Sequence, residues 1–69
     1  MMRLEYDTNV DAAYIYLVYP LRKGQAKKTK ELNNNIILDF DAKGRLLGVE
    51  ILHASKVLDK KVLLDAEVQ

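Results

Sequence analysis

The sequence predicts a mostly β domain of the α+β class, an antiparallel sheet of about five short strands in a meander with a short C-terminal helix. Apolar residues recur with a period of two over most of the chain, which is typical of half-buried strands. Turn formers such as Asn33-Asn34-Asn35 separate these runs, and short connections favour hairpins over parallel crossovers. The period becomes helical only from Ala54 onward, which places the helix at the end.

Two strands are predicted before the proline. Residues Arg3–Asp7 alternate polar and apolar side chains, and the turn formers Thr8 and Asn9 follow them. Ala12–Val18 is rich in Tyr, Ile and Val, and both of its faces are apolar, which predicts a central strand. One face would carry Ala13, Ile15 and Leu17, and the other Tyr14, Tyr16 and Val18.

Three further strands are predicted after a loop bounded by Pro20 and Gly24. Gln25–Leu32 is polar, and its lysines suit an exposed edge. Ile36–Phe40 and Arg45–Leu52 alternate apolar residues and can pack as a hairpin. Their facing apolar sets are Ile36, Leu38 and Phe40 in the first strand and Leu47, Val49 and Ile51 in the second.

The tail has a different period. Ala54, Val57, Leu58 and Val62 fit a helical stripe, and Ser55 is a candidate cap for a short helix. Three alternatives remain open for residues 61–69: an extension of the helix, a strand, or a segment that pairs with another chain.

The composition limits what this protein can be. A chain of 69 residues is expected to form one small domain, 1–69, and it buries only about 60% of the surface that its unfolded form exposes. We expect its core within 3–58 and a tail, 59–69, that contacts a second copy or a partner. Without cysteine it has no disulfide or thiolate chemistry, which suits a reducing compartment. Its apolar runs fall far short of the roughly 20 residues of a membrane span, so we expect a cytoplasmic protein.

Charge is unevenly distributed, although the formal net charge is only +1. Five of the 11 basic residues lie between Arg22 and Lys30 with no acidic residue among them, and they define a basic segment, 22–30. Such a segment can bind a phosphate backbone, but no aromatic residue interleaves this one. The sequence favours a solvated edge strand and leaves nucleic-acid binding through 22–30 as the alternative.

The segment from Asp39 to Glu50 nearly fits the calcium loop of an EF-hand. Asp39, Asp41, Gly44 and Glu50 stand at its first, third, sixth and twelfth positions. Lys43, however, occupies the fifth position and offers a positive charge in place of an oxygen ligand. We predict a hairpin turn instead, with Gly44 in a left-handed conformation that closes a type I turn and bulge, and we expect no metal or other cofactor.

Few residues are candidates for catalysis. Glu50 precedes His53 by three positions, the spacing of carboxylate-bridged di-iron helices, but the sequence lacks the further ligands of such a site. Ser55 has none of the flanking glycines of a nucleophile elbow. The sequence therefore predicts a non-enzymatic protein.

Paired carboxylates are available as Asp7 with Asp11 and as Asp39 with Asp41. Each pair stands beside a predicted turn, where aspartates commonly bond nearby backbone N–H groups. An enzyme that uses Asp39, Asp41 and Glu50 on one rim is the least favoured alternative, because no base and nucleophile accompany them.

Four tyrosines, at positions 6, 14, 16 and 19, lie in or beside the first two predicted strands. Tyrosines can stack nucleic-acid bases, but in apolar strands they more often fill a core or an oligomer interface. We therefore predict self-association. The expected interaction surface comprises Tyr14, Tyr16, Lys27, Lys28, Lys30 and Glu50.

Two blocks of the sequence carry a recognisable pattern. The first reads Y-D-x3-D-A-A-Y-I-Y-L at residues 6–17, and the second reads I-L-D-F-D-A-K-G-R-L-L-G-V-E-I-L-H-A-S-K at residues 37–56. The chain resembles, over nearly all of residues 3–58, a family of small bacterial and archaeal proteins, domain-of-unknown-function family 2283. Ala13 stands where that family usually has Leu, and His53 stands where it often has Asp.

The resemblance implies no catalytic residue, because the family has no assigned activity. In genomes, members of this family sometimes occur next to small toxin-like proteins. The resemblance therefore implies an antitoxin-like or partner-binding role. We therefore expect a small cytoplasmic interaction module that acts as a homo-oligomer, with a small toxin-like protein as a further partner and no membrane contact. The alternative is a nucleic-acid-binding or regulatory module that uses residues 22–30.

Overall fold

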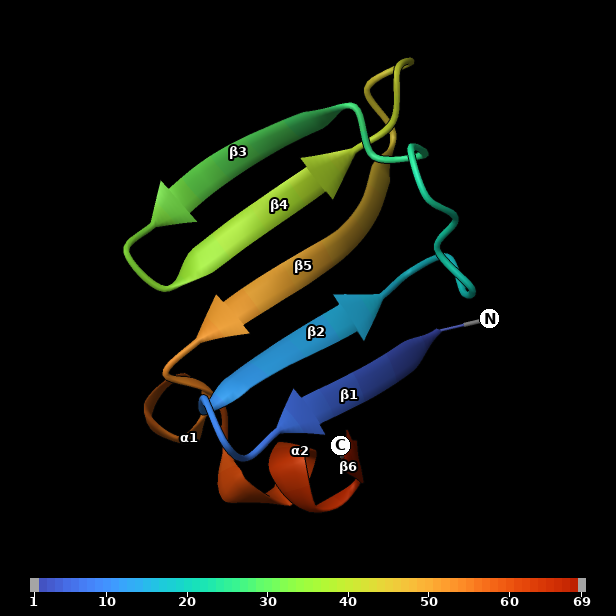
Figure 1. Cartoon of the computed structure of the whole chain (residues 1–69). Coiled ribbons are helices and arrows are strands. Elements are labelled where there is room, and N and C mark those ends of the chain that lie inside the picture. The colour runs from blue at the N-terminus through green and yellow to red at the C-terminus, as the bar shows by residue number, and fades with distance from the viewer. Residues whose placement is uncertain (1, 69) are drawn as a thin grey trace.

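A computed structural model describes residues 2–68, which form a six-stranded mixed sheet with two short helices (Figure 1). The strand order is β3-β4-β5-β2-β1-β6, and every neighbouring pair is antiparallel except β1 with β6. This architecture confirms the predicted mostly β class. In chain order the elements are β1 (Arg3–Asp7), β2 (Ala12–Tyr16), β3 (Lys28–Asn33), β4 (Ile36–Phe40), β5 (Leu46–Leu52), α1 (Ala54–Val57), α2 (Lys60–Leu64) and β6 (Glu67–Val68).

The five predicted strands all form, with small differences at their ends. Strand β2 stops at Tyr16, two residues early, because the N–H groups of Leu17 and Val18 both donate to the Leu47 carbonyl and turn the chain out of the sheet. Strands β3, β4 and β5 form a meander, and β1 and β2 form a hairpin that lies beside β5. The tail adds β6, a two-residue parallel strand, and a strand was one of the three alternatives left open for residues 61–69.

Pairing register divides the sheet into two chemically different faces. Tyr14 pairs with Glu5 and Glu50, so these side chains share one face, called here the tyrosine face. Ile15 pairs with Leu4 and Val49 on the opposite face, called the helix face. The predicted alternation of β2 is therefore confirmed. In β3 the alternation puts Lys28 and Lys30 on the helix face and Thr29 and Glu31 on the tyrosine face.

A buried hydrophobic cluster lies on the helix face where α1 packs on β2 and β5, and Leu47, 3% exposed, is buried outside it. Ala13, Ile51 and Ala54 are 2%, 3% and 0% exposed and form its centre. Two of these residues are alanines, and their small side chains let α1 approach the sheet closely. The partly buried residues around them are Leu4, Tyr6, Ile36, Val49, Val57, Leu58 and Leu63.

The predicted single helix is two helices, separated at Leu58 and Asp59. Leu58 is extended, and the Asp59 carboxylate starts α2 by accepting a hydrogen bond from the Lys61 N–H at 2.8 Å. Ser55, the residue expected to cap the helix, lies inside α1 instead. Figure 1 shows both helices at the β1–β2 side of the sheet, with β3 and β4 farthest from them. No helix within residues 2–68 is long and apolar enough to cross a membrane.

The segment from Asp41 to Arg45 is the predicted hairpin turn. Gly44 has a φ of 82° and its N–H donates to the Asp41 carbonyl, while the Asp41 N–H donates to the Arg45 carbonyl. The pairing of β4 with β5 shifts by one residue beside this turn, as expected for a bulge. The Asp41 carboxylate is occupied by the N–H groups of Lys43 and Arg45 and by Arg45 Nε. These hydrogen bonds lower the pKa of Asp41.

Candidate functional site

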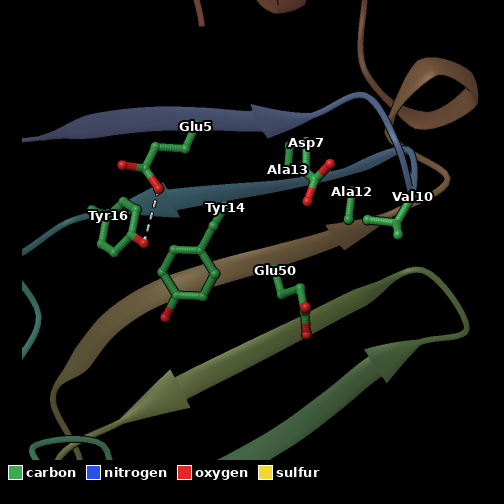
Figure 2. A pocket seen from close by; sticks show the side chains of 8 residues that line it. All are labelled: Glu5, Asp7, Val10, Ala12, Ala13, Tyr14, Tyr16 and Glu50. Carbon is green, nitrogen blue, oxygen red and sulfur yellow. Dashed lines mark hydrogen bonds between the residues drawn. The ribbon is translucent and has the colours of Figure 1, made fainter. Parts of the chain in front are cut away.

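The tyrosine face carries a shallow open hollow of about 260 Å³ over β1, β2 and β5 (Figure 2). Carboxylates and phenol rings make up most of its polar lining. Its lining residues are Glu5, Asp7, Val10, Ala12, Ala13, Tyr14, Tyr16 and Glu50.

Tyr14 joins three strands across this face. Its ring crosses β5 over Gly48, where a Cβ atom would lie only 2.5 Å from Tyr14 Cε1. The Tyr14 hydroxyl donates to Asp39 Oδ2 on β4 at 2.7 Å. The other oxygen of Asp39 accepts from Thr29 Oγ1 on β3 at 2.9 Å. Gly48 is therefore required for the ring to lie flat and reach the Asp39 carboxylate.

A second chain of contacts runs along the β1–β2 side of the face. The Tyr16 hydroxyl donates to Glu5 Oε1 at 3.1 Å (Figure 2). Arg3 Nε donates to Glu5 Oε2 at 2.9 Å. The Arg3 guanidinium stands over the Tyr19 ring, 4.7 Å from its centroid. The Tyr16 ring lies 4.5 Å from that of Tyr14 and 5.1 Å from that of Tyr19. The three tyrosines therefore form one continuous aromatic surface.

The phenols of this face are held in their protonated form. Burial raises the pKa of Tyr14, and its hydrogen bond to Asp39 raises it further. Burial and the bond to Glu5 likewise raise the pKa of Tyr16. At neutral pH both groups are hydrogen-bond donors rather than bases. The Glu50 carboxylate has no hydrogen-bond or ion-pair partner among residues 2–68, and Glu50 lines the hollow from β5 (Figure 2).

A second polar cluster, centred on Asp11, joins the β1–β2 turn to α1. One Asp11 oxygen accepts from the Tyr6 hydroxyl at 2.7 Å and from the Ser55 N–H at 2.9 Å. The other accepts from Ser55 Oγ at 2.7 Å, and the Asp11 carbonyl accepts from the Ala54 N–H. Asp11 therefore caps the N-terminus of α1 from the distant β1–β2 turn, because it accepts hydrogen bonds from the first N–H groups of the helix. Its φ of 53° is in the left-handed region, which aspartate tolerates better than most residues.

Hydrogen bonding fixes the charge state of this cluster. The bond from Tyr6 and then those from Ser55 lower the pKa of Asp11, and the same bond to Asp11 raises the pKa of Tyr6. Ser55 thus bonds to a carboxylate that stays ionised, and no imidazole contacts its hydroxyl in the described chain. The Asp11 carboxylate thus bonds to Ser55, 44 positions away, and not to the nearby backbone N–H groups that the sequence predicted for aspartates beside turns.

His53 contacts Asn35, in the turn between β3 and β4. It is exposed, has a φ of 54°, and places Nδ1 3.0 Å from Asn35 Oδ1. Glu50 lines the hollow of the tyrosine face, and the hydrogen-bond partner of His53 is Asn35 instead. Across residues 2–68, no group of three or more His, Cys, Asp or Glu side chains is arranged to hold a metal ion.

The structure separates the six residues of the expected interaction surface. Tyr14, Tyr16 and Glu50 line the hollow of the tyrosine face together. Lys28 and Lys30 belong to the edge strand β3 and lie on the helix face. Lys27 precedes β3, and its N–H donates to the Phe40 carbonyl.

Sequence reasoning missed several residues that the tyrosine face depends on. The sequence analysis does not group Tyr14 with Glu5, Asp39 and Gly48. The period of two fixes which residues of each strand share a face, and in the structure Glu5 and Tyr14 are paired on the same face. That signal could have linked Glu5 to the tyrosines. The role of Gly48 depends on β2 lying next to β5, which the period does not specify.

The helix face has a part that the helices do not cover. Here the open half means Ile15 of β2, Leu38 and Phe40 of β4, and Val49 of β5, which share this face by register. All four are half-buried apolar side chains. The basic residues Lys28 and Lys30 pair with Phe40 and Leu38 and flank this surface. An apolar surface with a charged rim has the composition of a protein interface.

Comparison with known proteins adds a family but no activity. Residues 3–55 match the family described as "Protein of unknown function (DUF2283)". An uncharacterized protein of Methanocaldococcus jannaschii is 38% identical over 66 residues, which cover 91% of this chain and 52% of that protein. The chain thus spans about half the length of this curated relative. No solved structure matches the chain significantly.

Proposed function

Because the chain belongs to the DUF2283 family, whose description states no function, we propose a function from geometry: a non-enzymatic interaction module that binds a second copy of itself through the open half of the helix face. The observation that carries this proposal is the half-covered apolar face of a one-layer sheet. Isolated sheets need their apolar face covered by another layer. Here α1 and α2 supply that layer only beside β1, β2 and the end of β5 (Figure 1).

The accessible surface supports association. The described chain has 5070 Å² of accessible surface at a mass of 7.9 kDa. Folded monomers of this mass expose about 4,400 Å² by the usual scaling, so the excess is about 650 Å². A standard interface buries about 800 Å² on each partner. The excess is therefore close to the area that one interface would remove.

The chemistry of the polar clusters supports binding over catalysis. Tyr6, Tyr14 and Tyr16 have raised pKa values and donate to carboxylates, while the pKa of Asp11 is lowered. Efficient acid or base catalysts have a pKa near the working pH, and these shifts move the groups away from it.

Sedimentation of the purified protein at tens of micromolar tests the proposal. We expect a species of twice the 7.9 kDa of one chain. Leu38→Lys should convert it to a folded monomer, because a charge in the centre of the open half opposes burial. Val10→Lys is the matched control, since Val10 is 68% exposed and lies on the tyrosine face. A wild-type protein that stays monomeric at tens of micromolar would contradict the proposal.

The control also separates the two faces. If Val10→Lys dissociates the dimer and Leu38→Lys does not, the interface is the tyrosine face and the assignment to the open half is wrong. The family resemblance adds a small toxin-like protein as a candidate partner for the same surface. Co-purification of such a protein in fixed ratio, lost in Leu38→Lys and kept in Val10→Lys, would assign the open half to that partner instead.

A further inference from the structure

The two edges of the sheet differ in how their backbone groups are used. At one edge the chain's own tail adds β6 to β1, with Glu5 and Tyr6 in register with Glu67 and Val68. Arg3 reaches Glu67 across this edge at 3.7 Å. The sheet thus accepts a short extended segment that carries an acidic residue beside a basic one.

The other edge, β3, has no such cover in the described chain. All six of its residues are exposed, and its only strand partner within residues 2–68 is β4. Its outward backbone N–H and C=O groups are therefore available to another strand. Leu32, 60% exposed, adds apolar surface at this edge.

We infer that β3 binds an extended acidic segment of a partner protein, which adds to the sheet as a further strand. This inference extends the proposed interaction module but uses the edge instead of the open half. Backbone hydrogen bonds would supply affinity in such strand addition, and alternate side chains would supply specificity. Lys28 and Lys30 of β3, with Lys27 directly before the strand, give the edge a positive character.

The register of β3 predicts the sequence pattern of the partner. Lys28 and Lys30 lie on one face, and Thr29 and Glu31 lie on the other. Residues directly opposite on adjacent strands interact through their side chains. A partner strand with acidic residues two positions apart would pair both with Lys28 and Lys30. Its intervening residues would face Thr29 and Glu31, where acidic side chains are disfavoured.

A second copy of β3 meets like charges at this edge in four of the six registers centred on a residue of Lys28–Asn33. Two-fold antiparallel pairing of a strand with itself sets residues of the same face opposite one another. Registers centred on Lys28, Thr29, Lys30 or Glu31 would oppose Lys28 to Lys28, Lys28 to Lys30, Lys30 to Lys30 or Glu31 to Glu31. Like charges in directly opposite positions destabilise a sheet.

Nucleic acid is also less well matched than a peptide. No aromatic side chain lies within residues 22–30 to stack on bases. The unpaired backbone of an edge strand offers directional hydrogen bonds at the spacing of another strand, which a phosphate backbone does not match.

Fluorescence anisotropy with a labelled peptide of alternating Thr and Glu tests the inference at physiological salt. A block peptide of the same composition, with its Glu residues consecutive, is the control for simple charge attraction. We expect the alternating peptide to bind about ten-fold more tightly than the block peptide and to lose about ten-fold in affinity against Lys28→Glu/Lys30→Glu. Amide NMR shifts should map to Lys28–Asn33.

A backbone N-methylated copy of the alternating peptide keeps the protein unchanged and removes the strand hydrogen bonds. We expect it to fail to bind. Equal binding of the block or N-methylated peptide would overturn the inference, as would a DNA oligonucleotide that binds 22–30 while the peptide does not. Peptide binding that persists in the Leu38→Lys monomer would separate this result from the fate of the self-association proposal.

Discussion

The two halves of the sheet differ in how far helices and other side chains cover them. In the half formed by β1, β2 and the end of β5, α1 covers the sheet and the Asp11 cluster fastens the β1–β2 turn to the helix. In the half formed by β3 and β4, every residue of β3 is exposed and every residue of β4 is half-buried. The contrast teaches that one half holds the buried cluster, while the other keeps half-buried apolar side chains and an exposed edge strand.

The largest difference between the halves should come from matched truncations. Ile51→Ala should lower the free energy of unfolding by about 2–5 kcal/mol, because it leaves a cavity under Ala54. A chain of 69 residues has only about 3–10 kcal/mol in total, so much of this variant should be unfolded. Leu38→Ala should cost only about 1 kcal/mol in dilute protein, because Leu38 is half-buried. Urea denaturation followed by circular dichroism measures both.

Equal losses of unfolding free energy in Ile51→Ala and Leu38→Ala would show that the two halves of the sheet contribute equally to stability. Dilute conditions matter here, because a dimer would add the free energy of association to the apparent stability of the wild type. At high protein concentration, the loss of unfolding free energy in Leu38→Ala relative to the wild type should become larger. The corresponding loss in Ile51→Ala should change little.

Gly48 lies where the two halves meet, and its substitution should have the next largest effect. Gly48→Ala should destabilise the protein by about 1–3 kcal/mol, since the new Cβ would displace the Tyr14 ring and break its bond to Asp39. Tyr14→Ala removes the overlap, so Gly48→Ala in that background should cost clearly less. A double-mutant cycle from thermal unfolding measures this coupling. Additive effects would show that the ring does not depend on Gly48.

Acid should weaken the covered half through Asp11. The pKa of Asp11 is lowered in the folded state, so its contribution is present above the ordinary value of 3.8 and is lost as the pH falls through the folded value. Asp11→Asn should melt below the wild type at neutral pH, and the gap should narrow as the pH falls below 3.8. Melting temperatures between neutral pH and pH 3 follow this change. A gap that stays constant would mean that the charge of Asp11 does not contribute.

The smallest effect on stability is expected at the open edge. Lys28→Gln/Lys30→Gln should change the free energy of unfolding by less than about 0.5 kcal/mol, because both side chains are exposed and no ion pair or hydrogen bond engages them in the described chain. The same change should weaken the alternating acidic peptide. A large loss of stability would instead assign these lysines a structural role.

Sequence reasoning found what depends on local pattern. The bounds of β1 and β4, the turn at Gly44 and the two faces of β2 all follow from alternation and turn chemistry. For the tail the sequence left a strand as one of three alternatives, because the two residues of β6 carry no period and their pairing depends on the tail folding back onto β1.

The sites depended more on tertiary placement than the strands did. Asp11 and Ser55 are 44 positions apart, and Tyr14 and Asp39 are 25 apart. Only the strand order brings them together. The basic segment was visible in the sequence, but its separation from Tyr14, Tyr16 and Glu50 required the register of β3.

The most direct test of the central claim is a dilution series of amide NMR spectra on the wild-type protein. If the open half binds a second copy, amides of Leu38, Phe40 and Val49 should shift with concentration, while those of Asp11 and Ser55 stay fixed. Shifts confined to Tyr14, Tyr16 and Glu50, or no shifts at all up to high concentration, would contradict the account.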